Sequence, residues 1–456
     1  KAAWPEADFV VGNPPFIGSK RMREALGDGY VDALQESWPE VPQATDFVMR
    51  WWHHAAALTR QGALERFGLI TTNSLRQTYV RRAVEPHLTG EPPLSITFAI
   101  PDHPWVDSAD GAAVRIAMTA GKRGRLLGTR LDVVEERVEA DSNNDDLVVR
   151  MTSRVGCINA DLSIGIDVTG AVALRANQDL CSVGMKTIGS AFQVDADRAA
   201  KLGLGSTPGL EVHIRPYLNG RDFTGTARGI FVLDFFGQDV ETLREKFPAA
   251  YQYLLEYAKP ERNQNRNSIF RERWWVIGHP RQQFRKATAG LSRYIATIET
   301  SKHGFFAFVP IQITPDSTLV TIAVENSAVL GTLSSSIHKT WFLAAGGLLE
   351  DRPRYNKTTC FEPFPFPIAT DDQQAHLRSL AEQLDAHRKR QQAAYPDLTL
   401  TGMYNVLDKL RSGEPQTAKE RVIHEQGLVS VLRQLHDEID AAVLDAYGWG
   451  DLLPLL

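Results

Sequence analysis

Cysteine is scarce in this sequence, and long apolar runs are lacking. The three cysteines, Cys157, Cys181 and Cys360, lie far apart, with no CxxC pair and no Cys/His cluster at zinc spacing. This argues against a disulfide framework and favours a reducing cytoplasm. No apolar run approaches the roughly 18 residues that a membrane span requires. The first residues also lack the apolar stretch of a signal peptide.

An excess of positive charge is lacking as well. The formal net charge of −5 argues against a uniformly basic surface but allows a local basic cleft. The 456 residues, 43% of them hydrophobic, suffice for two or three domains with their own cores. The sequence does not begin with Met, and a strand pattern starts almost at once. We therefore expect a piece of a longer polypeptide, or a trimmed form of one.

Strand and helix patterns alternate up to about residue 120, which is an α/β layout. Strands are expected at 8–12, 66–74, 94–100 and 112–120, and helices at 44–63 and, broken at Pro86, at 80–88. The spacing of Phe47, Val48, Trp51 and Trp52 predicts the first helix, and Gly62 predicts its end. The polar ends of such strands are where α/β folds place their sites.

The alternation stops near residue 121. Residues 138–146 are expected to form an acidic loop or hairpin tip. Beyond residue 155, the sequence predicts short strands, with many aromatic residues and scattered Arg. The proline-rich stretch 361–367 predicts a domain boundary, and the remainder has helical period. We expect three domains, at 1–150, 151–368 and 369–456.

A stiff polar corner, Asn13-Pro14-Pro15-Phe16, ends the first strand. Each proline fixes its own φ and restricts the preceding residue to extended geometry. Asn13 offers a carbonyl acceptor, the peptide carbonyls offer others, and Phe16 offers a flat face. Two acceptors and a stacking ring suit a planar group bearing NH2, such as an adenine rotated out of its duplex. Held in this way, the nitrogen can attack an electrophilic methyl group. An isolated Asn-Pro-Pro is otherwise only a turn.

The stretch DFVVGNPPF (8–16) resembles motif IV of the amino-methyltransferases that modify adenine in DNA, with S-adenosylmethionine as methyl donor. Residues 45–58 resemble the motif V helix of that family, and 66–77 the following strand, with Asn73 at its tip. Residues 99–118 resemble motif VIII, whose aromatic packs on the far face of the flipped base.

The resemblance implies a catalytic set, which is Asn13, Pro14, Pro15, Phe16 and, by position in motif VIII, Trp105. It also implies that Asp46 and Phe47 border the cofactor. No metal is expected for methyl transfer.

Later segments of the sequence are similar to MmeI-like (type IIL) enzymes, which are single-polypeptide restriction-modification proteins. These segments are 215–225, 271–287, 294–310, 333–342, 351–367 and 435–449. The implied fold is the second half of a Rossmann-like class I methyltransferase domain, then an α+β target-recognition domain and a helical C-terminal domain.

The family places its glycine-rich cofactor loop, and further upstream its nuclease, before the corner, whereas only twelve residues precede Asn13 here. We therefore expect the missing N-terminal part of the same polypeptide to be a partner, beside double-stranded DNA. We also expect an open apolar edge on the first strand and weak binding of S-adenosylmethionine by this chain alone.

Basic residues gather between 259 and 286, interleaved with Asn and Gln. Positive charge binds phosphates, and Arg, Asn and Gln suit base edges. The DNA-binding candidates are Arg262, Arg266, Arg271, Arg273, Arg281, Arg285 and Lys286, together with Lys302, Arg352 and Arg354 further on. Glu350 and Arg352 alternate in a way that suits base edges or an ion-paired loop. His53 and His54 lack partner ligands and are expected at the surface or in packing.

Two other function classes fit parts of the pattern. Protein-glutamine methyltransferases also carry an Asn-Pro-Pro-aromatic corner, because glutamine presents a planar NH2, but they lack a long C-terminal recognition region. A non-catalytic DNA-specificity fragment fits the absence of the cofactor loop. The leading hypothesis is an adenine-specific DNA methyltransferase of a restriction-modification or phage-defence system, incomplete in this chain.

Overall fold

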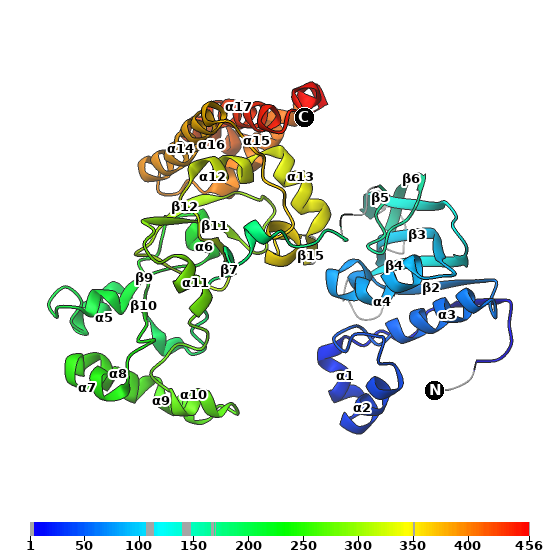
Figure 1. The fold of residues 1–456 in the computed structure, drawn as a ribbon, viewed down its shortest axis with the longest axis horizontal. Coiled ribbons are helices and arrows are strands. Elements are labelled where there is room, and N and C mark those ends of the chain that lie inside the picture. The colour runs from blue at the N-terminus through cyan, green and yellow to red at the C-terminus, as the bar shows by residue number, and fades with distance from the viewer. Residues whose placement is uncertain are drawn as a thin grey trace. The chain divides into compact units, whose positions relative to one another are not determined.

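The protein divides into two compact units, Lys1–Gly170 and Ala171–Leu456. The computed structural model describes residues 4–105, 114–138, 147–165, 168, 170–349 and 352–455. Figure 1 shows the helices and strands of both units. Within the described ranges, none of the helices has the length and apolar character that crossing a membrane would take.

The first unit is built on a six-stranded sheet with the order β1-β2-β4-β3-β5-β6. Its strands are β1 (Phe9–Gly12), β2 (Arg66–Thr72), β3 (Leu94–Trp105), β4 (Val114–Arg123), β5 (Gly128–Val138) and β6 (Leu147–Gly156). β1 pairs with β2 in parallel, β4 runs antiparallel between β2 and β3, and β5 is parallel to β3. The carboxyl ends of β1, β2 and β3 therefore share one edge of the sheet.

Helices connect these strands. They are α1 (Ser19–Leu26), α2 (Asp28–Ser37), α3 (Met49–Gln61), α4 (Thr78–Thr89) and the short 3-10 helix η1 (Asn73–Arg76). The helix expected from apolar spacing is α3, which ends at Gly62 in the left-handed conformation, as expected. Its buried Trp52 donates from Nε1 to Thr119 Oγ1 at 3.0 Å, which fixes α3 to β4.

The expected break at Pro86 is wrong, because α4 continues through it to Thr89. Pro86 lies in the last turn, where the loss of one backbone N–H removes little of the helix. The other strands and helices expected up to residue 120 are present, whereas α1 and α2, between β1 and α3, were not expected.

The second unit contains two four-stranded sheets and one two-stranded sheet, with the orders β13-β9-β10-β8, β12-β11-β14-β7 and β15-β16. Its strands are β7 (Cys181–Val183), β8 (Gln193–Val194), β9 (Ile214–Leu218), β10 (Phe231–Leu233), β11 (Arg293–Ile298), β12 (Ala307–Pro310), β13 (Thr314–Pro315), β14 (Leu319–Ile322), β15 (Gly347–Leu349) and β16 (Arg352–Arg354).

Short helices surround these sheets. They are η2 (Arg175–Asn177), η3 (Ser190–Phe192), α5 (Ala196–Lys201), η4 (Leu210–Val212), α6 (Gly220–Thr224), α7 (Val240–Lys246), α8 (Pro248–Tyr257), α9 (Lys259–Asn263), α10 (Ser268–Glu272), α11 (Gln282–Ala287), α12 (Ser327–Ser334), α13 (Ser336–Ala345) and the π-helix η5 (Lys357–Phe361).

Long helices follow, as predicted for the C-terminal region. They are α14 (Asp371–Ala394), α15 (Leu400–Ser412), α16 (Ala418–Gly427) and α17 (Val429–Tyr447), with η6 (Gly450–Leu455) at the end. Thr370 and Thr417 each form a capping box with the residue three positions on, which explains why α14 and α16 begin there.

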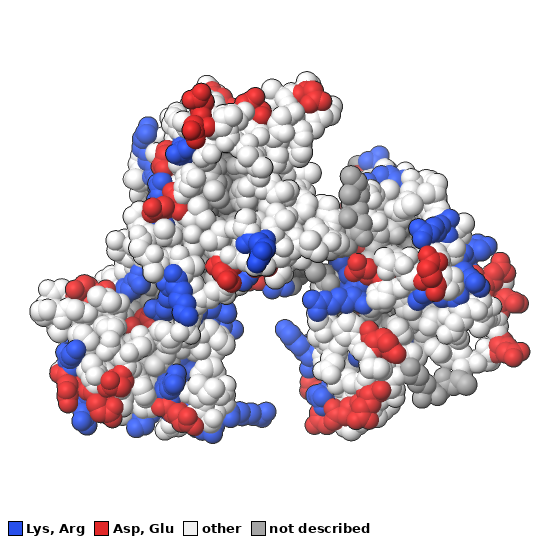
Figure 2. All heavy atoms as spheres, in the orientation of Figure 1, with Lys and Arg blue, Asp and Glu red and all other residues white. Residues whose placement is uncertain are grey.

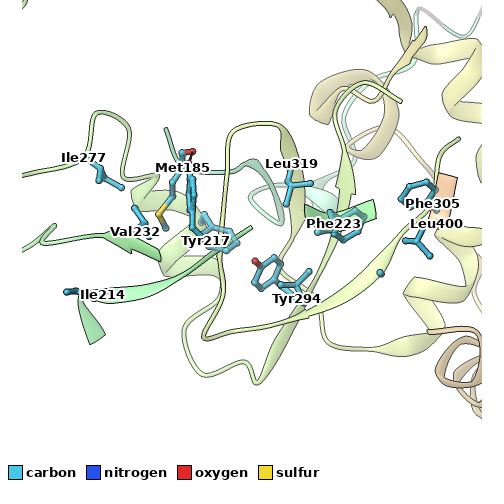
Figure 3. Close-up of a cluster of buried hydrophobic side chains, with 14 of the residues drawn as sticks. Met185, Ile214, Tyr217, Phe223, Val232, Ile277, Tyr294, Phe305, Leu319 and Leu400 are labelled. Atoms are coloured by element: carbon cyan, nitrogen blue, oxygen red, sulfur yellow. Dashed lines mark hydrogen bonds between the residues drawn. The ribbon is translucent and has the colours of Figure 1, made fainter. Parts of the chain in front are cut away.

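One apolar core joins the sheets of the second unit to its C-terminal helices. Figure 3 shows part of this core, including Tyr294, Phe305 and Leu400 of α15. The ring of Phe305 lies 5.4 Å from that of Tyr404, also in α15.

The units differ from the expected domain boundaries. The position expected at 150 falls inside β6, which pairs with β5 along its length. The position at 368 separates segments that share one core, so no division into compact units occurs there.

Candidate active site

The corner Asn13–Phe16 lies directly after β1, at the carboxyl edge of the first sheet. Asn13 is exposed, and within the described residues its side chain makes no hydrogen bond. Phe16 is half-buried and packs against the core under the sheet. The amide oxygen of Asn13 is therefore available to accept a hydrogen bond at the point where the chain leaves the strand.

Two backbone segments meet just beyond the corner. Phe47 N donates to Ile17 O at 3.0 Å, and Ile17 N donates to Asp46 Oδ1 at 3.2 Å. The same carboxylate oxygen accepts from Val48 N at 3.1 Å, just before α3 begins. Asp46 is 9% exposed, and its burial raises the pKa of the carboxyl group. Asp46 thus fixes the start of α3 against the corner.

A cavity of about 170 Å³ lies between α2 and the first turns of α3, which Phe47 precedes. It is lined by Trp4, Tyr30, Leu34, Trp38, Phe47, Arg50, Trp51 and His54. The rings of Phe47 and Trp51 meet edge to face, 4.5 Å apart. Such aromatic walls suit a flat ring. The sequence pattern pointed to Phe47 but missed Trp4 and Trp38, which come from outside the motif V helix.

Arg50 is the charged member of this lining. Its side chain is 3% exposed, and its Nη1 donates to Thr45 O at 3.3 Å and Asp46 O at 3.2 Å. Nε and Nη2 find no hydrogen-bond partner in the described part of the chain. Burial lowers the pKa of Arg50.

Trp105, the last residue of β3, is half-buried at the same edge of the sheet as the corner. Because β1 and β3 both point to this edge, the two aromatic candidates Phe16 and Trp105 share it, with β2 and β4 between their strands. Residues 106–113, which continue the expected motif VIII, lie outside the described residues.

Arg262, one of the expected DNA contacts, is internal. Only 2% of the residue is exposed, and its Nη2 donates to Thr187 O at 3.0 Å and Val276 O at 3.1 Å. Its guanidinium lies over the rings of Phe192 and Phe270, at 4.8 and 5.0 Å. Burial lowers its pKa. The charge pattern could not reveal this, because the partners lie elsewhere in the chain.

Arg281 and Arg285 are half-buried and already have partners. Arg281 has a left-handed φ of 50°, and its Nε donates to Gly184 O at 3.0 Å. Arg285 forms an ion pair with Asp234, and its Nε donates to Pro280 O at 2.8 Å. These contacts hold both side chains against the second unit.

Arg266, Arg271, Arg273 and Lys286 are exposed. Arg271, in α10, donates to Asn265 O at 2.6 Å and Arg266 O at 3.0 Å, both just before that helix. Within the described residues, the side chains of Arg266, Arg273 and Lys286 make no hydrogen bond or ion pair. Figure 2 shows that basic and acidic side chains both occur on the visible face of the second unit.

The remaining basic candidates come together at another place. Thr300 bridges to Arg354, and Ser301 N donates to Pro353 O at 3.3 Å, so the loop after β11 joins the β15–β16 hairpin. Lys302 Nζ donates to Asn405 Oδ1 at 2.7 Å, and Arg354 pairs with Glu299 at 2.6 Å. Arg352 is exposed on β16, whereas Glu350 lies outside the described residues.

No metal site is found in the part of the chain that the structure describes. His53 and His54, expected at the surface or in packing, are half-buried and have packing roles. His53 Nδ1 lies 2.9 Å from His87 Nε2, and the ring of His54 meets those of Trp4 and Trp38.

The chain was compared with known protein families, curated sequences and solved structures. Residues 2–125 match the family described as MmeI, DNA-methyltransferase domain. No curated protein sequence matches the chain significantly.

Among solved structures, the type IIL restriction-modification enzyme MmeI, determined in complex with DNA, matches with a TM-score of 0.71 at 20% identity. The match covers 97% of this chain and 54% of that one. The type IIG restriction endonuclease BpuSI covers the same shares at 11% identity with a TM-score of 0.29, which is too low to support an argument.

The match to MmeI shows the fold, and the chain spans about half the length of that enzyme. The expected mixed α/β architecture with a helical C-terminal region is confirmed. The chain is therefore similar to MmeI, with a match to the methyltransferase-domain family over residues 2–125 and the MmeI fold over nearly all of its length.

Proposed function

We propose that this chain belongs to a restriction-modification DNA methyltransferase that transfers a methyl group from S-adenosylmethionine to the amino group of a flipped adenine. The observation that carries the proposal is the free amide of Asn13 at the carboxyl edge, in a segment that matches the MmeI methyltransferase domain. A location in the cytoplasm, where cellular DNA is accessible, belongs to the same proposal.

In the proposed mechanism, Asn13 Oδ1 and the carbonyl oxygen of Pro14 accept the two amino hydrogens of the target base. This draws the nitrogen lone pair out of conjugation, so that it can act as a nucleophile. Pro15 stiffens the turn, and Phe16 and Trp105 stack on the base. Stacking contributes about 1–3 kcal/mol per base, which offsets part of the cost of flipping.

The residues on the cofactor side fit a flat heterocycle. Phe47 and Trp51 would provide the wall for an adenine ring, and Asp46 would hold this wall beside the corner. When bound, S-adenosylmethionine supplies an electrophilic methyl group. Methyl transfer of this kind uses positioning rather than a covalent enzyme intermediate.

The open edge of β1 supports a further part of the proposal. Phe9 is 58% exposed and Val11 is 86% exposed, although both are strand residues of apolar type. An uncovered apolar edge strand is a template for pairing. We assign this edge to the N-terminal part of the same polypeptide, which would also contribute the cofactor-binding loop.

The DNA contacts are proposed according to how far each basic side chain is exposed. The freely exposed cations Arg266, Arg273 and Lys286, with Arg271 beside them, are retained as phosphate contacts. Lys302, Arg352 and Arg354 are retained as a second group on the joined loop and hairpin. Arg281 and Arg285 would contribute charge from fixed positions, and Arg262 is not retained because it is internal.

The test uses the full-length protein, S-adenosylmethionine with a labelled methyl group and unmodified mixed-sequence duplex DNA. Label on the adenine amino group is expected, and Asn13→Ala should abolish it while leaving DNA affinity within a few-fold. Gln43→Ala is the matched control, because Gln43 is an exposed amide near α3 and remote from the corner in sequence.

Two other outcomes would overturn the proposal. Label in added protein extract instead of DNA would indicate glutamine chemistry at the corner. Binding of DNA without any label would indicate a non-catalytic specificity fragment.

A further inference from the structure

A chain of polar contacts ties four strands together at the carboxyl edge, and the proposed mechanism does not use it. Asn73, directly after β2, donates from Nδ2 to Asp102 Oδ1 at 3.2 Å. Arg115 of β4 donates from Nε to the same oxygen at 2.6 Å. Arg115 then reaches Glu136 of β5, with Nη2 and Oε1 2.8 Å apart.

The backbone is irregular where this contact forms. The pairing of β3 with β4 shifts register between Ile100 and His103, so that Asp102 lies in a bulge. A bulge re-aims a side chain, and bulges are frequent beside active sites. Here the bulged residue is the one that contacts Asn73, at the edge where Trp105 ends β3.

The carboxyl group of Asp102 has charged neighbours. Its carboxylate lies against the Arg115 guanidinium, and the two side chains are about equally exposed, at 33% and 35%. The hydrogen bond to Glu136 makes the largest contribution to the raised pKa of Arg115, and Asp102 raises this pKa as well. Arg76, in the same 3-10 helix as Asn73, also interacts with Asp102.

The contact fixes how the amide of Asn73 is presented. One N–H of Nδ2 is committed to Asp102, which leaves Oδ1 and the second N–H for another partner. Because Asn13 and Pro14 would hold both amino hydrogens of the base, the free N–H of Asn73 is the group left to donate to a ring nitrogen beside the amino group. Asn73 follows β2, the immediate neighbour of β1, so it shares the edge with Asn13.

We propose that Asn73 contacts the flipped base, and that Asp102 and Arg115 are positioning residues that hold its amide in the productive orientation. The inference rests on the proposed function, since it needs a base at this edge. The base it fits is one with an unprotonated ring nitrogen beside the carbon that carries the amino group, which describes adenine, cytosine and guanine but not thymine.

The experiment is a double-mutant cycle on methyl transfer to DNA by the full-length protein. Asn73→Ala should lower kcat/KM about 10- to 100-fold, the size expected for losing a base-reading amide. Asp102→Asn should lower it about 3- to 30-fold, and adding it to Asn73→Ala should have no further effect, because Asp102 acts through Asn73. Thermal midpoints should stay within a few degrees.

Lys122→Gln is the matched control, since Lys122 is on the same strand as Arg115 and pairs with Glu65 at 3.8 Å. It should leave kcat/KM within twofold. The inference is overturned if Asn73→Ala keeps activity within twofold, or if Asp102→Asn costs as much in the Asn73→Ala background as alone. Methyl transfer that survives Asn13→Ala would instead overturn the proposed function, so the two failures are distinct.

Discussion

The two units bury their sheets to different extents. In the first unit, both outer strands of the sheet carry exposed apolar side chains, with Val11 of β1 86% exposed and Val155 of β6 66% exposed. In the second unit, the central strands β11 and β14 are buried almost throughout, and C-terminal helices share their core. The second unit buries its central sheet under its own helices, whereas the first leaves apolar side chains of its outer strands exposed.

The largest effect is expected from the shared core of the second unit. Leu384 of α14 is fully buried in it, and Leu384→Ala should lower the free energy of unfolding of this unit by about 2–5 kcal/mol. Hydrogen exchange should show that the amide of Tyr294 in β11 loses protection together with α14. Leu69→Ala in β2 is the control for the first unit. Protection of Tyr294 that stays unchanged would mean that helices and sheet have separate cores.

A smaller effect is expected from acid, and it should again differ between the units. Burial lowers the pKa of His87 in the first unit, and of His338 and His436 in the second, to about 3 in each case. The unfolded state protonates near 6.5. Between these values only the unfolded state binds the proton, so stability falls as pH decreases, by about 1.4 kcal/mol per pH unit for each His. The second unit should therefore lose stability more steeply, and burial also lowers the pKa of its His279, His303 and His387.

Urea unfolding between pH 7.5 and pH 5 measures these slopes. His436→Gln should reduce the total loss of stability of the second unit between these pH values by about 2 kcal/mol, because Gln keeps a polar group beside Tyr404 OH without titrating. His87→Gln is the corresponding variant in the first unit. Equal slopes in the two units would contradict this part of the comparison.

The smallest effect in this chain should come from the open edge. Val11→Lys should change the stability of the first unit by less than about 0.5 kcal/mol, because the side chain is exposed. In the full-length protein the same substitution should cost about 2 kcal/mol or more, since the edge would be covered by the N-terminal part. Thermal unfolding of both proteins tests this. The same small change in both would refute a covered edge.

Much of the fold was predictable because its signals are local. The apolar strand 8–12, the spacing in α3, Gly62 at its end and the helical period beyond 371 each lie within one element. The error at Pro86 has a local cause as well, because a proline in the last turn costs less than one in the middle of a helix.

The charged residues were not predictable in this way. Arg262 and Arg273 look alike in the sequence, yet one is buried against the carbonyl of Thr187, 75 residues away, and the other is exposed. A cluster of basic residues in the sequence does not show which side chain forms hydrogen bonds inside the protein. Only the packing of α9 against the segment near Thr187 separates them.

The sequence by itself determined the order of strands and helices and the stiff corner Asn13–Phe16, because φ restrictions and periodicity act over a few residues. Tertiary structure decided the pairing of Asn73 with Asp102, 29 residues apart, and the union of the C-terminal helices with the second unit. Such contacts depend on which elements become neighbours. Which elements become neighbours depends on how the whole unit buries its apolar surface, and this cannot be read from any single segment of the sequence.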